Sequence, residues 1–342
     1  MTSSDQTWTV KAILDWCEGY LASKGDTNPR LSAQWLLGEA MGLSRIELYT
    51  NLDKPLSEEE RTRMRAWVQR RGAGEPLQLI CGTAPFRHMV LEVAPGVLIP
   101  RPETEVLISE VLAAFPAPKQ ISAYAFEDEA VVIPKADDNV EASEIGESVE
   151  SRDDVKLDQS IGGAEEASKA IRVVDLCTGS GCIACALATE HPTMELFALD
   201  IAPEALVLAQ RNVDVQGVAD RVRVIKSDLL SALVADPVNK GTFDAIVSNP
   251  PYIPSAVVDA LDAEVSEYEP RLALDGGSDG LDLFRRFIDD AHTLLKPGGI
   301  LAVELFEESL EEAAQIAQSH NFTEPRILSD LSQRPRILLA TR

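Results

Sequence analysis

The first 95 residues carry apolar positions at the spacing of amphipathic helices. Ser57, followed three residues later by Glu60, forms a capping-box pattern that predicts the start of a helix. Two strand-like apolar runs follow, at 77–81 and 89–93. These patterns predict a helical N-terminal domain over residues 1–95 that ends in a hairpin.

Two further segments separate this domain from the rest of the chain. Over 96–115, Pro100 and Pro102 exclude a helix until Thr104, so we expect a bracing segment followed by a helix. Residues 116–170 hold 14 acidic and five basic residues, a local net charge of −9, without sustained apolar periodicity. That composition predicts an acidic and mostly disordered insertion, which we interpret as a solvated tether.

From residue 171 onward, patterns typical of buried strands alternate with helical patterns. We expect strands at 171–176, 196–199, 222–225, 243–247, 300–305 and 336–340, and helices at 183–189, 203–215, 281–295 and 310–319. Such alternation predicts an α/β catalytic domain over 171–342, Rossmann-like and built on a mostly parallel, doubly wound sheet.

The composition of the chain argues against several classes of function and of site. The chain has 31 Lys and Arg against 56 Asp and Glu, and a net charge of −25 repels phosphate backbones and anionic membranes. No apolar run approaches a membrane span and the start lacks a secretory pattern, so we expect a cytoplasmic protein. The four scattered histidines predict no metal site. Cys177, Cys182 and Cys185 match part of an iron–sulfur spacing, but burial of small thiols on a packed helix explains them better.

A glycine-rich turn stands where the first strand of this domain ends: Asp175-Leu176-Cys177-Thr178-Gly179-Ser180-Gly181. Glycines let the backbone approach a ligand, and the following helix start offers free N–H groups. Asp200, 19 residues after Gly181, can accept from both ribose hydroxyls of a nucleoside cofactor. The spacing also fits a relaxed NAD pattern. The acid at Asp175, however, disfavours a pyrophosphate and suits the cationic amino-acid end of S-adenosylmethionine.

Asn249-Pro250-Pro251-Tyr252 directly follows a predicted strand, at the sheet edge where open α/β proteins bind ligands. The Asn249 side-chain oxygen and the Pro250 carbonyl can hold both hydrogens of an NH2 group on a planar amide or nucleobase. Tyr252 can pack its ring on that group, and the two prolines stiffen the loop. We therefore predict Asn249, Pro250 and Tyr252 as catalytic and all four residues as substrate-binding.

Asp228-Leu229, after the third strand, forms a weaker signal. The acid can accept from an adenine amino group, and the leucine can pack on the ring. From the pattern alone we thus predict cofactor binding by the turn 175–181, by Asp200, and by Asp228 and Leu229.

These residues resemble a known family, the peptide chain release factor glutamine N5-methyltransferases (HemK/PrmC), over nearly all of the chain except 116–170. Besides the glycine turn and the 249–252 loop, the resemblance is carried by 74–78 (Gly-Glu-Pro-Leu-Gln), 98–105 (Leu-Ile-Pro-Arg-Pro-Glu-Thr-Glu), 268–271 (Tyr-Glu-Pro-Arg) and 330–334 (Asp-Leu-Ser-Gln-Arg). A sister group that modifies a ribosomal protein has Ser-Pro where this chain has Pro102-Glu103.

The resemblance implies a seven-strand methyltransferase sheet and an N-terminal domain that recognises the substrate. It implies that S-adenosylmethionine is bound by Cys177, Thr178, Gly179, Ser180, Gly181, Asp200, Leu229 and Asn249. The 249–252 loop would hold the glutamine of the Gly-Gly-Gln motif of bacterial release factors. The chain departs from the family pattern in three places: Cys177 replaces a common glycine, 305–308 (Leu-Phe-Glu-Glu) replaces a glycine-containing turn, and 116–170 is extra.

Three alternatives remain at this point. The 249–252 tetrapeptide also occurs in nucleic-acid adenine-N6 methyltransferases, but the net charge and the lack of a long basic stretch disfavour them and predict no direct DNA binding. The second alternative is a glutamine methyltransferase of a ribosomal protein. The third, a catalytically inactive binding module, is disfavoured by the intact loop. The main hypothesis is an enzyme that methylates release factors, without DNA or membrane binding.

Overall fold

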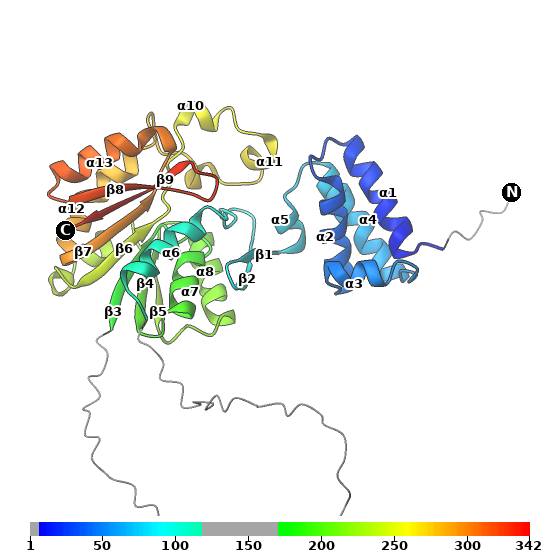
Figure 1. Ribbon diagram of the computed structural model, residues 1–342, viewed down its shortest axis with the longest axis horizontal. Helices are drawn as coiled ribbons and strands as arrows, with labels where there is room; N and C mark the ends of the chain where they lie inside the picture. The colour runs from blue at the N-terminus through cyan, green and yellow to red at the C-terminus, as the bar shows by residue number, and fades with distance from the viewer. Residues whose placement is uncertain (1–6, 118–169) are drawn as a thin grey trace, which may run out of the picture. The chain divides into compact units, whose positions relative to one another are not determined.

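A computed structural model describes residues 7–117 and 170–342. Its first five helices are α1 (Val10–Ser23), α2 (Pro29–Met41), α3 (Arg45–Thr50), α4 (Glu58–Gly72) and α5 (Leu77–Cys81) (Figure 1). Their apolar faces share one core, in which Leu21, Leu36 and Leu48 are fully buried. The predicted capping box is confirmed: Ser57 accepts from the Glu60 backbone N–H, and the Glu60 side chain accepts from that of Ser57.

The hairpin lies later than the sequence pattern predicts. Residues 77–81 form α5 and not a strand, and the hairpin pairs β1 (Thr83–Phe86) with β2 (Met89–Glu92) in antiparallel register. An apolar run of five residues does not distinguish a strand from a short helix. Here Leu77 and Ile80 both join the helical core, and Gly82 ends the helix at a left-handed φ of 77°.

The bracing segment ends in α6 (Thr104–Ala114), which begins at the predicted residue. The predicted acidic insertion at 116–170 falls almost entirely on 118–169, outside the described residues.

A seven-stranded sheet forms the centre of the rest of the chain, in the order β5-β4-β3-β6-β7-β9-β8. Its strands are β3 (Ile171–Leu176), β4 (Met194–Asp200), β5 (Val222–Lys226), β6 (Phe243–Ser248), β7 (Leu295–Glu304), β8 (Thr323–Ser329) and β9 (Pro335–Thr341). The first five strands of this sheet in chain order, β3 to β7, are parallel, and β9 runs antiparallel to both of its neighbours. The predicted α/β class with a mostly parallel sheet is confirmed. Because β4 and β6 flank β3 on opposite sides, the strand order reverses there, and ligands bind at such points.

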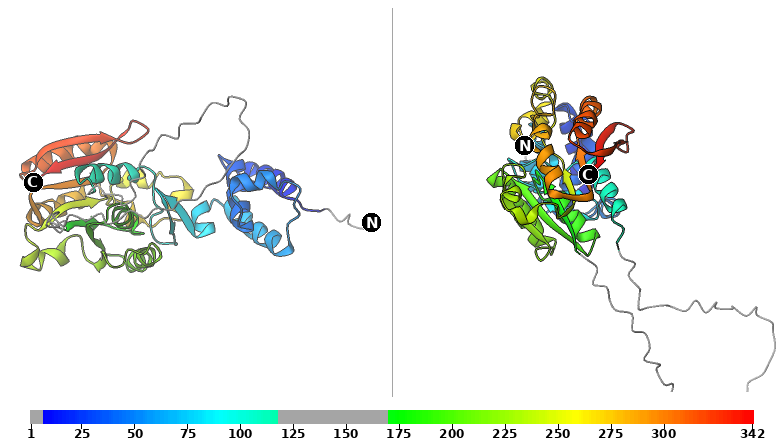
Figure 2. Two further views of the ribbon diagram at one scale, coloured as in Figure 1. Left: turned by 60° about the horizontal axis from the view of Figure 1, so that its bottom comes forward. Right: turned by 90° about the vertical axis from the view of Figure 1, so that its left-hand side faces the viewer.

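Helices cover both faces of this sheet (Figure 2). One apolar core contains α6, α7 (Cys182–Glu190) and α8 (Pro203–Val215), and a second contains α9 (Ser231–Val234), α12 (Asp282–Leu294) and α13 (Leu310–Ser319). The shorter elements are α10 (Ser255–Val258), α11 (Ala263–Ser266), η1 (Pro237–Asn239), η2 (Arg271–Ala273) and η3 (Glu307–Ser309). Within 7–117 and 170–342, every helix is too short or too polar to cross a bilayer.

β8 is the strand that the apolar pattern does not predict. It lies at the edge of the sheet, and none of its seven residues is fully buried. An edge strand without a buried face has no alternation of apolar residues, so only its pairing with β9 identifies it.

Candidate active site

A cavity of about 410 Å³ lies at the carboxyl ends of β3, β4, β5 and β6. Its lining includes eight of the predicted cofactor-binding residues: Cys177, Thr178, Gly179, Ser180, Asp200, Asp228, Leu229 and Asn249. Pro251 also lines it, whereas Asp175, Gly181, Pro250 and Tyr252 are not among its lining residues. The fold thus brings most of the predicted site together in one cavity and leaves these four residues outside its lining.

The glycine turn lies between β3 and α7. It depends on a backbone conformation that residues with a side chain rarely adopt. Cys177 and Gly179 both have left-handed φ values, 61° and 55°. A cysteine at such a position is strained, and strain of this kind concentrates at binding sites. Gly181 meets a different demand: a Cβ there would lie 3.2 Å from Ala209 Cα, so the missing side chain lets α7 pack against α8.

Asp175 holds this turn from beneath. Its side chain is fully buried, and Oδ2 accepts from the Thr178 hydroxyl at 2.5 Å and from the Ala184 backbone N–H at 3.0 Å. Oδ1 has no hydrogen-bond partner within the described residues. Burial raises the pKa of this carboxyl to about 7. The prediction that Asp175 binds the cofactor remains a prediction, and its observed contacts place it as the support of the turn.

The raised pKa of Asp175 predicts a pH-dependent stability. The folded state keeps its proton up to about pH 7, whereas the unfolded chain releases it near its ordinary value of ~4. The contribution of this group to the free energy of unfolding is therefore complete at low pH and is lost as the pH rises toward 7. Asp175→Asn keeps both accepted hydrogen bonds without the ionisation. We expect the stability of this variant to increase relative to wild type between about pH 4 and about pH 7 in urea titrations. A constant difference would contradict the assignment.

Asp200 ends β4 with its carboxylate already oriented. Oδ2 accepts from the Gly179 backbone N–H at 2.9 Å, and Oδ1 accepts from that of Ala202 at 3.0 Å. Each carboxylate oxygen has a second lone pair, which remains available to hydroxyl donors in the cavity. Binding of ribose hydroxyls by Asp200 stays a prediction, and this arrangement is suited to it.

Asp228 has a partner that sequence reasoning missed. Both of its oxygens accept from Arg286 on α12, at 2.9 and 3.0 Å, and both residues line the cavity. The carboxylate side chain is 55% exposed, so the ion pair adds little to stability. Next to it, Leu229 has a left-handed φ of 49°. That Asp228 accepts a hydrogen bond from an adenine amino group stays a prediction. Asp228 would have to do so while it also accepts from Arg286.

Behind the 249–252 loop lies a chain of hydrogen bonds that spans three elements. Asn249 Nδ2 donates to Thr104 Oγ1 at 2.9 Å, and the Thr104 hydroxyl donates to Glu304 Oε2 at 2.7 Å. The Tyr252 hydroxyl donates to the other oxygen of Glu304 at 2.8 Å. Burial raises the pKa values of both Glu304 and Tyr252. Thr104 and Glu304 are 200 residues apart in the sequence, so no local pattern signals their contact.

The glycine-rich segment 275–280 is a further feature that the sequence did not predict, and it packs against the backbone of Tyr252. A Cβ on Gly276 would lie 2.7 Å from Tyr252 Cα, and one on Gly280 would lie 2.2 Å from the Tyr252 carbonyl oxygen. Ile253 and Asp275 form a parallel β-bridge beside them. The position of Tyr252 therefore depends on two glycines that follow it by more than 20 residues.

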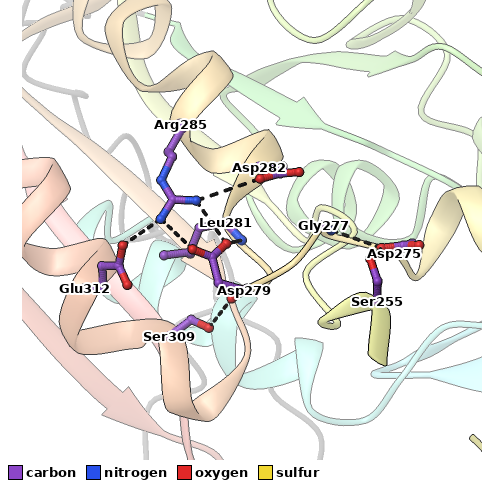
Figure 3. A network of polar contacts seen from close by, with 9 residues as sticks. All are labelled: Ser255, Asp275, Gly277, Asp279, Leu281, Asp282, Arg285, Ser309 and Glu312. Carbon is purple, nitrogen blue, oxygen red and sulfur yellow. Dashed lines mark hydrogen bonds and ion pairs between the residues drawn. The ribbon is translucent and has the colours of Figure 1, made fainter. Parts of the chain in front are cut away.

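Polar side chains fasten this segment at both ends (Figure 3). Asp275 accepts from the Ser255 hydroxyl at 2.6 Å and from the Gly277 backbone N–H at 3.0 Å. At the other end, Arg285 donates to both carboxylate oxygens of Asp279, at 2.9 and 2.7 Å. Arg285 also donates to Glu312 at 2.6 Å, so the segment is tied to α12 and α13.

The bracing segment lines part of the cavity and forms an ion pair with a buried acid. Residues 96–101 contribute to the lining, and Arg101 donates to Glu269 Oε2 at 2.6 Å. Glu269 is buried, which raises the pKa of its carboxyl. This contact joins two of the segments on which the family resemblance rests.

Neither the cysteines nor clusters of potential metal ligands suggest a second kind of chemistry in the described residues. Burial raises the pKa of the Cys185 thiol to about 12, and it also raises the pKa values of Cys177 and Cys182. Such thiols are poor nucleophiles at neutral pH. No group of three or more His, Cys, Asp or Glu side chains in 7–117 or 170–342 is arranged to hold a metal ion.

Comparison with known proteins supports both parts of the chain. The family model of the PrmC N-terminal domain matches residues 12–82, and that of the methyltransferase small domain matches residues 164–264. A curated protein of Geobacter sulfurreducens named release factor glutamine methyltransferase is 40% identical over 305 residues, which are 89% of this chain and 87% of that protein.

Two further relatives carry the same name. The protein of Rhodopirellula baltica is 35% identical over 98% of this chain and 97% of its own length, and that of Chlorobaculum tepidum is 33% identical over 97% of each. Identity at this level, over both the helical N-terminal part and the sheet that carries the cavity, confirms the resemblance. The chain therefore belongs to the family of release factor glutamine methyltransferases.

Proposed function

We propose that this chain transfers a methyl group from S-adenosylmethionine to the side-chain amide nitrogen (N5) of the glutamine in the Gly-Gly-Gln motif of peptide chain release factors. The observation that carries this proposal is the placement of Asn249 in the wall of the cavity formed by the glycine turn, Asp200 and Leu229. An acceptor for an amino group and a nucleoside-type site thus share one cavity, in a chain whose relatives carry that activity in their names.

The cavity fits the cofactor. Its volume of about 410 Å³ is in the range of small-molecule sites. Asp200 offers oriented acceptors for ribose hydroxyls, and Leu229 offers an apolar surface for the adenine ring. Gly179, at a left-handed φ, allows close approach of backbone N–H groups at the start of α7. When bound there, S-adenosylmethionine supplies an electrophilic methyl group.

The residues of the 249–252 loop act on the substrate amide. An amide nitrogen is a weak nucleophile, because its lone pair is delocalised into the carbonyl. Asn249 Oδ1 and the Pro250 carbonyl are suited to accept the two N–H bonds, which orients the nitrogen and favours the positive charge that develops on it. Tyr252, whose hydroxyl is held by Glu304, can pack its ring on the amide plane.

A release factor is the substrate that this chemistry favours over DNA. The chain carries a net charge of −25, which opposes binding to a phosphate backbone. We assign the helical N-terminal part to recognition of the release factor and place the enzyme in the cytoplasm, where release factors meet the ribosome.

One labelling experiment tests the proposal. The chain is incubated with S-adenosylmethionine labelled in the methyl group and, in separate reactions, with a release factor, ribosomal proteins or duplex DNA. We expect label only on the release factor, on the tryptic peptide that contains Gly-Gly-Gln. A release factor with glutamate in place of that glutamine serves as the control and should stay unlabelled. Label on DNA or on a ribosomal protein would favour one of the two other activities.

A further inference from the structure

The amide of Asn249 has two ends of nearly the same size and opposite hydrogen-bonding character. Its oxygen accepts and its NH2 group donates, and a rotation of the amide by half a turn exchanges them. Only one orientation suits a substrate that offers an NH2 group. The protein must therefore contain something that distinguishes the two orientations.

The distinction begins at Glu304. This residue ends β7, is 1% exposed, and accepts hydrogen bonds on both oxygens, from the hydroxyls of Thr104 and Tyr252. Both hydroxyls donate to Glu304, so each of its oxygens acts as an acceptor here. This fixes the direction of the hydrogen bonds that lead away from Glu304.

Thr104 transmits that direction to the cavity. A hydroxyl group has one hydrogen, and at Thr104 this hydrogen is donated to Glu304. Its oxygen can then only accept from its second neighbour, Asn249, which presents Nδ2 at 2.9 Å. The opposite orientation of Asn249 would place two oxygen lone pairs against each other beside the buried Thr104 side chain.

We infer that Thr104 and Glu304 fix the amide of Asn249 with its oxygen toward the cavity, and that they thereby select glutamine over glutamate as the substrate side chain. A glutamine NH2 group can donate to this oxygen, whereas a glutamate carboxylate meets it with a second acceptor. Both are positioning residues, because they act through Asn249. The inference rests on the proposed function and names the device that gives its site amide specificity.

The test compares two ligands that differ only in the selected group. A release factor and its variant with glutamate in the Gly-Gly-Gln motif are titrated onto the enzyme saturated with S-adenosylhomocysteine. In Thr104→Val, which has nearly the same volume but no hydroxyl, we expect the preference for glutamine to fall by about tenfold or more, because neither orientation of Asn249 is then favoured. We expect kcat to fall by up to about 10²-fold, with unchanged affinity for S-adenosylmethionine.

Three companion variants separate orientation from packing. Thr104→Ser retains the hydroxyl and should restore both the preference and kcat. Glu304→Gln supplies a donor that can reverse the chain of hydrogen bonds, so it should also lower the preference. Ile108→Val removes one buried methyl group from the same helix and should leave the preference intact.

The outcomes distinguish this inference from the proposed function. A wild-type enzyme that does not methylate the release factor contradicts the proposed function, whatever the variants do. A wild-type enzyme that methylates it while Thr104→Val or Glu304→Gln keeps the full preference for glutamine overturns the inference alone. Loss of preference that Thr104→Ser does not restore would also overturn it, because the methyl contact and not the hydroxyl would then be responsible.

Discussion

Replacing Asn249 by alanine is expected to lower kcat for methyl transfer by roughly 10²–10³, because it removes an oriented acceptor for the substrate amide. Most of the affinity for S-adenosylmethionine should remain, since Asp200, Leu229 and the glycine turn also line the cavity. Single-turnover kinetics with a release factor, together with calorimetric titration of the cofactor, measure the two quantities separately.

Asp200→Ala is the matched control for this prediction. It removes the acceptors at the end of β4, so it should weaken cofactor binding and leave a cofactor-saturated rate much closer to wild type. The two variants should thus divide their effects between affinity and rate. Near-wild-type turnover in Asn249→Ala would mean that this side chain does not orient the substrate.

Replacing Gly280 by alanine is expected to abolish activity and to destabilise the fold. The new Cβ would lie 2.2 Å from the Tyr252 carbonyl oxygen, so Tyr252 or the 275–280 segment must move. Overpacking of this kind costs ~1–3 kcal/mol. The left-handed φ of 80° adds about 1–2 kcal/mol for a residue with a side chain. Chemical unfolding and the methylation assay give the two readouts.

Gly298→Ala separates the clash from the backbone strain. Gly298 has a φ of 79°, but a Cβ there would meet no atom within 4 Å. It should therefore show the backbone penalty alone and keep its methyltransferase activity. Equal losses of stability in the two variants would show that the close approach to Tyr252 has no energetic consequence.

Much of the sheet could be predicted from the sequence, because its strands are buried on both faces and its helices are amphipathic. The predicted bounds of β3, α8 and α13 agree with the structure to the residue. These elements have strong local signals: continuous apolar runs, Pro203 in a first turn, and apolar residues at helical spacing.

Local patterns predicted the wrong element, or none, where an element is short or lies at the edge of the sheet. The run 77–81 is apolar in either conformation, and packing on the N-terminal helical core made it a helix. β8 has no buried face, so its identity depends on its partner strand β9.

For the candidate site, the sequence by itself determined which side chains follow the carboxyl ends of the strands. A parallel sheet places the carboxyl ends of its strands at one edge, so the glycine turn, Asp200, Leu229 and Asn249 were expected to meet there. They do line one cavity. The assignment of each residue to cofactor or substrate stays a prediction.

Only the tertiary structure decided how those groups are supported. Asp175 lies under its turn and not in the cavity wall, because the buried carboxylate is used by Thr178 and Ala184. Thr104 reaches Glu304 across 200 residues, and Gly280 reaches Tyr252 across 28. Contacts between distant segments depend on which strands become neighbours and on how closely the backbones approach. Neither quantity has a local pattern, so the orientation of Asn249 and Tyr252 could be learned only from the folded chain.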